Sequence, residues 1–164
     1  MKHFFLIMAL TLLAATPSTA ETNHDQKSNQ GLLNLDFSKD VTHITSQKLV
    51  LSNKKREFTY LGSVTVEHGD LLLDCDQLDG SYSEANEIQI LIAKSNVHIK
   101  KGDNIRATGN KAVFSAKDQT IRLTENPQLE QDGSVLSADL VIIYMDQDRS
   151  EAQGNVRVSL IEKK

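Results

Sequence analysis

The amino-acid sequence predicts an all-β protein in which an antiparallel sheet folds over on itself as a jellyroll-like sandwich. A unit of about thirty residues recurs four times after residue 40, and each copy alternates apolar and polar residues as a strand does. After the first twenty residues, no stretch keeps the 3.6-residue period of an amphipathic helix. One face of each expected strand is apolar and the other polar, so the apolar face has to be covered by another part of the sheet.

The chain begins with the pattern of a cleaved signal peptide, residues 1–20. Lys2 and His3 form a short basic start, residues 4–15 are apolar but too few to span a bilayer, and residues 18–20 give a small-x-small cleavage site after Ala20. A retained membrane anchor is the alternative interpretation. Because Glu21 rather than cysteine follows, we do not expect a lipid-anchored lipoprotein.

Residues 21–40 are mostly polar and predict a flexible leader. Leu32, Leu33, Leu35 and Phe37 are the exception and could dock as a short edge segment. A single domain is expected over residues 41–161, followed by a tail of residues 162–164.

Each repeat opens with a large apolar, a polar and a small residue, which places a bulky and a small side chain on one strand face. These openings are residues 44–46, 73–75, 105–107 and 136–138. A turn signal then runs straight into a second alternating strand at residues 62–64, 95–97, 125–127 and 154–156. The middle residue of each turn signal is Ser or Asn, at positions 63, 96, 126 and 155, and successive positions are 33, 30 and 29 residues apart. Such a period is typical of stacked copies of one supersecondary unit.

Composition narrows the classes of function. The formal net charge is −4, so the chain lacks the basic balance of a nucleic-acid binder. Cys75 is the one cysteine, and it falls at the small-residue position that Ser46, Ala107 and Ala138 fill in the other copies. A small buried core residue is therefore favoured over a reactive thiol, and stability must come from burial and strand pairing.

The inner strand face carries the candidate binding site. Small residues in register (Ser46, Cys75, Ala107, Gly109 and Ala138) let two sheet faces pack, or leave a channel between larger apolar side chains. That channel would be lined by Ile44, Leu73, Val97, Ile99, Ile105, Phe114 and Leu136. It would suit an extended acyl chain, since each buried methylene contributes roughly 0.8 kcal/mol and a whole chain on the order of 10 kcal/mol before ordering costs.

The charged residues indicate a particular function less clearly than the apolar face does. The basic runs 54–56 and 100–101 are typical of solvated turns, although they could meet the phosphates of an amphiphile at the rim. Asp74, Asp76 and Asp79 lack the spacing and glycine of a calcium loop, which favours a solvated face. The three histidines within the repeats, at 43, 68 and 98, are scattered over different units, and we find no catalytic motif. We therefore expect no enzyme, no metal site and no cofactor.

The repeated motifs at 44–49, 61–66, 136–140 and 153–158, behind an export signal, resemble those of the OstA-like family over about residues 41–161. This resemblance implies a V-shaped β-jellyroll, open at both ends, that stacks head to tail. It also implies a periplasmic groove that passes lipopolysaccharide from an inner-membrane adaptor to an outer-membrane assembly. The lipid-lining positions of the family are similar to Thr42, Ile44, Ile99, Phe114 and Ala116.

The sequence departs from the family pattern in places. The usual Gly-Asn-Val is Gly62-Ser63-Val64 in the first copy and Ser95-Asn96-Val97 in the second. An apparent two-residue insertion near Gly109 leaves the register of the third copy open, and with it Phe114 and Ala116. The alternative function is a scaffold module that joins envelope proteins through its strand edges and carries no lipid. A membrane-anchored adaptor of the same family is a further possibility.

Overall fold

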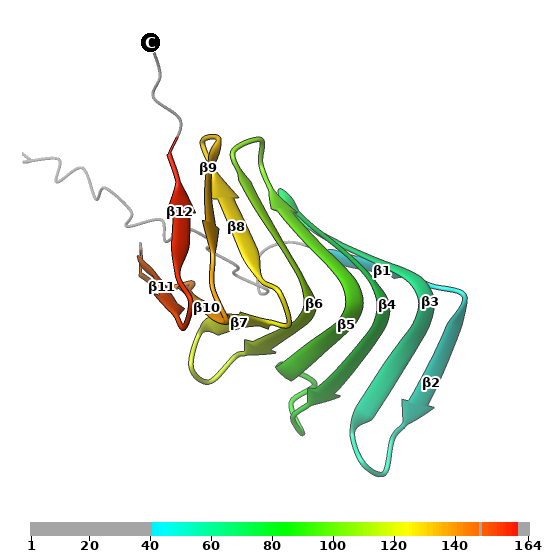
Figure 1. Cartoon of the computed structure of the whole chain (residues 1–164). Coiled ribbons are helices and arrows are strands. Elements are labelled where there is room, and N and C mark those ends of the chain that lie inside the picture. The colour runs from blue at the N-terminus through cyan, green and yellow to red at the C-terminus, as the bar shows by residue number, and fades with distance from the viewer. Residues whose placement is uncertain (1–40, 148, 161–164) are drawn as a thin grey trace, which may run out of the picture.

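The structure, a computed structural model, describes residues 41–147 and 149–160. Within these residues the chain forms one 12-stranded antiparallel sheet, which is not closed into a barrel and contains no helix (Figure 1). The all-β prediction is confirmed. The expected signal peptide, the leader with its apolar segment 32–37, and the tail 162–164 lie outside the described residues. Among the described residues, no helix is long and apolar enough to cross a membrane.

The strands follow one another with short connections. They are β1 (Thr42–Thr45), β2 (Lys48–Ser52), β3 (Glu57–His68), β4 (Leu71–Tyr82), β5 (Ile88–Lys101), β6 (Ile105–Ser115), β7 (Thr120–Thr124), β8 (Gln128–Gln131), β9 (Ser134–Ser137), β10 (Leu140–Tyr144), β11 (Arg149–Gln153) and β12 (Arg157–Ser159).

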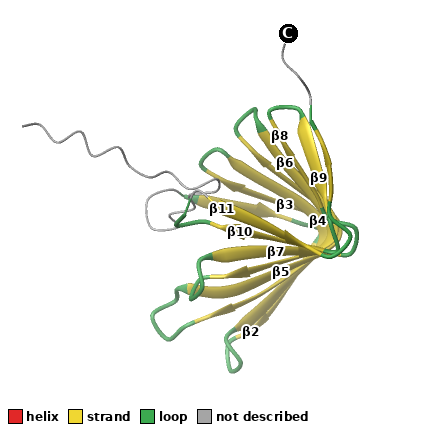
Figure 2. Ribbon diagram, turned by 60° about the vertical axis from the view of Figure 1, so that its left-hand side comes forward, coloured by secondary structure: helices red, strands yellow, loops and turns green. Residues whose placement is uncertain are grey.

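The sheet is bent along one line, so that it forms two arms. Arm A comprises residues 42–45, 64–68, 71–75, 97–101, 105–109, 128–131, 134–137 and 157–159. Arm B comprises residues 48–52, 57–61, 77–82, 88–94, 111–115, 120–124, 140–144 and 149–153. Strands β3 to β6 cross the bend and belong to both arms. Figure 2 shows the strands spreading from a common side, which gives the molecule its V shape.

The bend coincides with four pairs of left-handed residues. They are Gly62-Ser63 (φ 78° and 47°), Ser95-Asn96 (59° and 52°), Glu125-Asn126 (61° and 65°) and Gly154-Asn155 (71° and 45°). Two successive left-handed residues add a bulge to the strand and turn it sharply. The regular turn signal of the sequence therefore marks corners between the arms, and in β3 and β5 the strand continues through the corner.

Side chains brace two of these corners. Asn96 donates from Nδ2 to the Asp76 carboxylate at 2.7 Å, and Asn155 donates likewise to Asp139 at 2.9 Å. In each case an asparagine, which tolerates a left-handed backbone, reaches back to an acid of the preceding strand segment. Each of these corners is thus specified by residue types at two points of the chain, 20 residues apart in the first case and 16 in the second.

The register of the third repeat differs from that expected. Residues paired in series across arm A form an apolar row: Ile44, Val66, Leu73, Ile99, Ala107, Leu129, Leu136 and Val158. Ala107 therefore aligns with Ile44, Leu73 and Leu136, whereas Ile105 lies two residues nearer the arm tip. The match of Ala107 with Cys75 was wrong, because the insertion shifts Gly109 into the corner position.

The core lies between the arms and includes the single cysteine. Val97, Leu123, Val141 and Ile143 have no solvent exposure. Cys75 is 4% exposed, and its thiol donates to the Gln77 carbonyl oxygen at 3.2 Å. Burial raises the pKa of this thiol to about 11. The interpretation of Cys75 as a core residue is confirmed.

Candidate functional site: an apolar groove between the arms

The two arms turn their apolar faces toward each other. The candidate residues Thr42, Ile44, Leu73, Val97, Ile99, Ile105 and Leu136 lie on arm A, while Phe114 lies on arm B and Ala116 follows it at the end of β6. Val97, Ile99 and Phe114 are buried in the core. Ile44, Leu73, Ile105, Ala116 and Leu136 are partly buried and pack against it. Thr42 is the exposed member, and its hydroxyl lies 2.9 Å from Nδ1 of His68.

A small cavity lies between the arms. Its volume is about 50 Å³, and its lining includes the expected residues Leu73, Ile99 and Phe114. Other lining residues were not identified from the sequence: Val66, Leu71, Leu78, Leu91, Ala112 and Ile121. The alternation of their strands was the available signal, but only the pairing shows which strands face the cavity.

An aromatic cluster on arm B was also missed. The Phe58 ring lies 5.5 Å from that of Tyr60 in an edge arrangement and stacks on Tyr82 at 6.5 Å. Phe58 occupies the space above Gly80, where an added Cβ would collide with the ring. Glycine at position 80 thus permits the close approach of a large side chain from the neighbouring strand.

Both ends of the groove are bordered by unpaired strand edges. Among the described strands, β1 and β2 pair with β3 alone, β11 with β10 alone and β12 with β9 alone. Leu49 and Leu51 of β2 are 50% and 56% exposed, and Val158 of β12 is 56% exposed. The apolar face therefore reaches solvent at each end.

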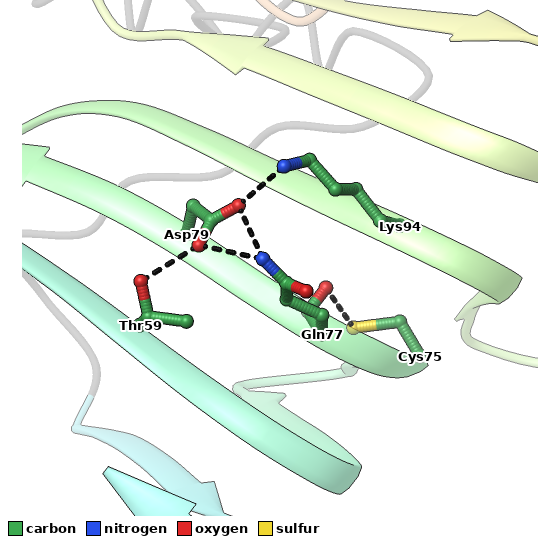
Figure 3. Close-up of polar contacts among 5 residues, drawn as sticks. All are labelled: Thr59, Cys75, Gln77, Asp79 and Lys94. Carbon is green, nitrogen blue, oxygen red and sulfur yellow. Dashed lines mark hydrogen bonds and ion pairs between the residues drawn. The ribbon is translucent and has the colours of Figure 1, made fainter. Parts of the chain in front are cut away.

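The outer face carries polar ladders in which the aspartates have separate partners. Asp79 accepts hydrogen bonds from Thr59 at 2.7 Å and from Gln77 at 2.9 and 3.0 Å, and pairs with Lys94 at 2.7 Å (Figure 3). Partial burial raises the pKa of Asp79, but the contacts with Lys94, Thr59 and Gln77 outweigh it and hold the pKa below its usual value. Asp74 accepts from Thr65 at 2.7 Å.

Asp74 and Asp79 therefore form cross-strand contacts within the sheet. In the described part of the chain, no group of three or more His, Cys, Asp or Glu could hold a metal. The basic run 54–56 lies in an exposed turn, where Arg56 pairs with Glu84 at 2.7 Å. Lys100 lies 3.7 Å from Asp103.

Comparisons with known proteins agree with this geometry. Among solved structures, one similar chain is "LptH, the LptA homologous periplasmic component of the conserved lipopolysaccharide transport device from Pseudomonas aeruginosa". The match has a TM-score of 0.68 at 11% sequence identity and covers 82% of this chain and 99% of that one, which shows a shared fold. No curated protein matches the sequence. The sequence profile described as "LptA/(LptD N-terminal domain) LPS transport protein" matches residues 43–149, and the chain belongs to that family.

Proposed function

We propose that this protein carries lipopolysaccharide across the periplasm as a bridge between inner and outer membranes, with the acyl chains held between the two arms. The observation that supports the proposal most is the apolar row, which runs without a polar interruption from Ile44 at one open end to Val158 at the other. The chain belongs to a lipopolysaccharide-transport family, and LptH, which shares its fold, is a periplasmic component of a lipopolysaccharide transport device. Both findings support the same function.

Acyl chains enter when the arms move apart. The cavity between the arms has a volume of only about 50 Å³, so an acyl chain needs more space than this arrangement offers. Left-handed pairs mark the bend in β3, in β5 and in the connections that follow β7 and β11, while β4 and β6 pass through it as continuous strands. Opening at this bend would let each arm keep its own hydrogen-bonded strands. Burial of roughly 0.8 kcal/mol per methylene offsets the cost of opening. Because transport needs release as well as binding, the lipid binds reversibly along the row.

Strand directions support head-to-tail contacts with further copies and with the membrane complexes. In arm A, β12 runs away from the corner and β1 runs toward it; in arm B, β2 runs away and β11 runs toward it. A second copy placed end to end would continue both arms as antiparallel sheet. Such heterologous contacts build open filaments, and the inner-membrane adaptor and outer-membrane assembly would use the same edges.

Site-specific photo-crosslinking in cells tests the lipid proposal. A photo-reactive amino acid at Ile44, Ile99 or Phe114 should capture lipopolysaccharide, because these side chains lie on the inner face. The controls are Arg122 and Arg157, which are exposed on the outer face. Equal capture from both faces would exclude a groove that shields acyl chains.

A scaffold that carries no lipid is the second candidate, favoured by the small volume of the cavity between the arms. Ile99→Asp and Phe114→Asp separate the two functions, because a charge in the groove opposes lipid binding, while β5 and β6 have neighbours on both sides and the edge strands stay unchanged. Circular dichroism first establishes that the variants fold. If folded variants still assemble with partners and still deliver lipopolysaccharide, the protein acts as a scaffold.

A further inference from the structure

We propose that charge on arm B decides which ends of two copies of this chain meet, with a basic edge of one copy set against an acidic edge of the next. The basic edge is β2 with the turn after it, residues 48–56, and the acidic edge is β11 with residues 146–147 of the turn before it. Among the described strands, each edge strand has one paired neighbour. The proposal rests on the head-to-tail contacts of the proposed function and names the residues that select them.

Neighbouring hairpins touch at the tip of arm B, the end of the arm farthest from the bend. The backbone N–H of Tyr82 donates to the carbonyl oxygen of Arg56 at 3.0 Å, and the Arg56 side chain pairs with Glu84 at 2.7 Å. The next two pairs of hairpins are joined by similar backbone hydrogen bonds, from Ala116 to Gln89 at 2.9 Å and from Met145 to Gln119 at 2.8 Å. A second copy placed end to end would continue this series, with its turn 53–56 set against the turn that contains Asp146.

Opposite charges face each other in this arrangement. One row of paired residues runs from Ser52 of β2 to Arg149 of β11, and its continuation sets Arg149 opposite Ser52 of the next copy. Three residues farther out, Asp146 then lies level with Lys55 of that copy. Neighbouring strands are about 4.8 Å apart, which is within the reach of a lysine side chain. Asp146, Lys54 and Lys55 are exposed, and none of them forms an ion pair with another described residue.

The inner faces of the two edges also fit each other. Leu49 and Leu51 of β2 lie on the inner face and are 50% and 56% exposed. The inner residues of β11 are Ser150 and Ala152, which are small and partly buried. In the continued rows Leu49 lies opposite Ala152 and Leu51 opposite Ser150, so large side chains meet small ones across the junction. This fit joins unlike ends.

The two edges differ in charge along their length. In the sequence, residues 48–56 hold four basic residues and no acid, whereas residues 146–153 hold three acids and one arginine. This arginine, Arg149, lies 3.7 Å from the centre of the Tyr144 ring and 3.6 Å from Glu151, so it contacts its own copy. In arm A the end strands β1 and β12 hold one histidine and one arginine, so the opposite charges belong to arm B.

The charges exclude contacts between like ends. Strand pairing alone permits such contacts, because β2 can also pair antiparallel with β2 of a second copy and close a symmetric dimer. Two basic edges repel each other, as do two acidic ones, whereas a basic edge attracts an acidic one. The charges therefore favour open chains of copies over closed pairs.

Charge reversal tests this selection. Lys54→Glu/Lys55→Glu should weaken assembly of the exported, lipid-free chain roughly tenfold, because each junction then sets acid against acid. Asp146→Lys/Gln147→Lys should weaken it similarly, because each junction then sets base against base. A 1:1 mixture should recover the assembly of the wild type, because every junction between the two variants again joins opposite charges. Sedimentation velocity measures all four samples.

A matched control separates the edges from net charge. Lys111→Glu/Lys117→Glu makes the same change in net charge on β6 and the turn after it, away from both ends, and should assemble like the wild type. An equal loss in this control would overturn the proposal. So would wild-type assembly by either edge variant alone, a mixture as weak as its components, or a wild type that stays monomeric at every concentration.

A carbodiimide, which joins a lysine amine to a carboxylate in contact with it, tests the junction directly. It should couple Lys54 or Lys55 to Asp146 of another copy. Mixing ¹⁵N-labelled and unlabelled protein identifies by mass spectrometry the products that join two molecules. Products that join these lysines only to acids elsewhere would contradict the junction.

This proposal and the carrier function fail in different ways. The assembly measurements contain no lipid, so they depend on the edges alone. If the chain carries no lipopolysaccharide, a photo-reactive amino acid at Ile99 captures none, while mixing the two edge variants still restores assembly. If the charges do not select the ends, the edge variants assemble like the wild type and lipid capture at Ile99 persists.

Discussion

The middle of the groove and its two ends use the same alternation of residues with opposite results. In the middle, by which we mean the strands that have a paired neighbour on both sides, Leu123, Val141 and Ile143 have no solvent exposure, because those neighbours and the opposite arm cover them. At the ends, Leu51 and Val158 are each 56% exposed, although they follow the same pattern. Apolar alternation therefore marks the inner face, while burial depends on whether a strand has neighbours on both sides.

The ends also differ from each other. The apolar edge at the N-terminal end is β2, in arm B, whereas the apolar edge at the C-terminal end is β12, in arm A. The other C-terminal edge, β11, carries Arg149 and Glu151, whose side chains lie 3.6 Å apart. The buried side chains that stabilise the fold thus lie in the middle, and the exposed apolar surfaces that could bind other chains lie at the ends.

The largest expected effect on stability comes from the middle. Leu123→Ala should lower the free energy of unfolding by about 3 kcal/mol, because it leaves a cavity where the side chain is fully buried. The matched control Leu51→Ala should lower it by less than about 0.5 kcal/mol. Denaturant unfolding measures both, and similar losses would show that middle and ends are equally packed.

Replacing Gly80 should give the next largest loss of stability, with Gly102 as the comparison. Gly80→Ala should cost about 1–3 kcal/mol, because the new methyl group meets the Phe58 ring and forces it to move. Gly102→Ala has open space for its Cβ but a φ of 54°, which predicts about 1 kcal/mol. If Gly80→Ala proved neutral in thermal unfolding, the Phe58 ring would not be held over this strand.

The buried thiol of Cys75 should make the free energy of unfolding fall at alkaline pH. The pKa of its thiol rises from 9.0 in the unfolded chain to about 11 in the fold, because burial disfavours the thiolate. The stabilisation is complete below pH 9 and is lost as the pH rises toward 11. Unfolding free energies measured over this range should fall in the wild type and fall less in Cys75→Ala. Parallel curves would place the thiol in contact with water.

Substitutions at the ends should change assembly with little change in stability. Leu51→Lys or Val158→Lys adds a charge to an exposed edge, which opposes strand addition by another copy. Sedimentation velocity should show smaller assemblies than the wild type, while unfolding shifts by less than about 0.5 kcal/mol. If the assemblies kept their size, the copies would associate through a surface other than β2 and β12.

Much of the apolar row could be predicted from residue patterns. Ile44, Leu73, Ile99 and Leu136 were placed on one face by alternation and do lie together in the apolar row. The third repeat was misaligned, because the large residue Ile105 resembles the opening of the other copies better than Ala107 does. Phe58 and Gly80 were not connected, since their contact joins neighbouring strands through a pairing that neither residue reveals.

The sequence by itself determined the strand content, the inner face, the repeat and the family, because strand alternation and turn chemistry are local properties. Only the tertiary structure decided that Ser95-Asn96 and its equivalents are corners. Hairpin turns and corners both use residues with positive φ, and the difference lies in which distant strands pair on either side. The small volume of the cavity was likewise a tertiary outcome, because the space between two arms depends on side chains that meet across it from strands far apart in the chain.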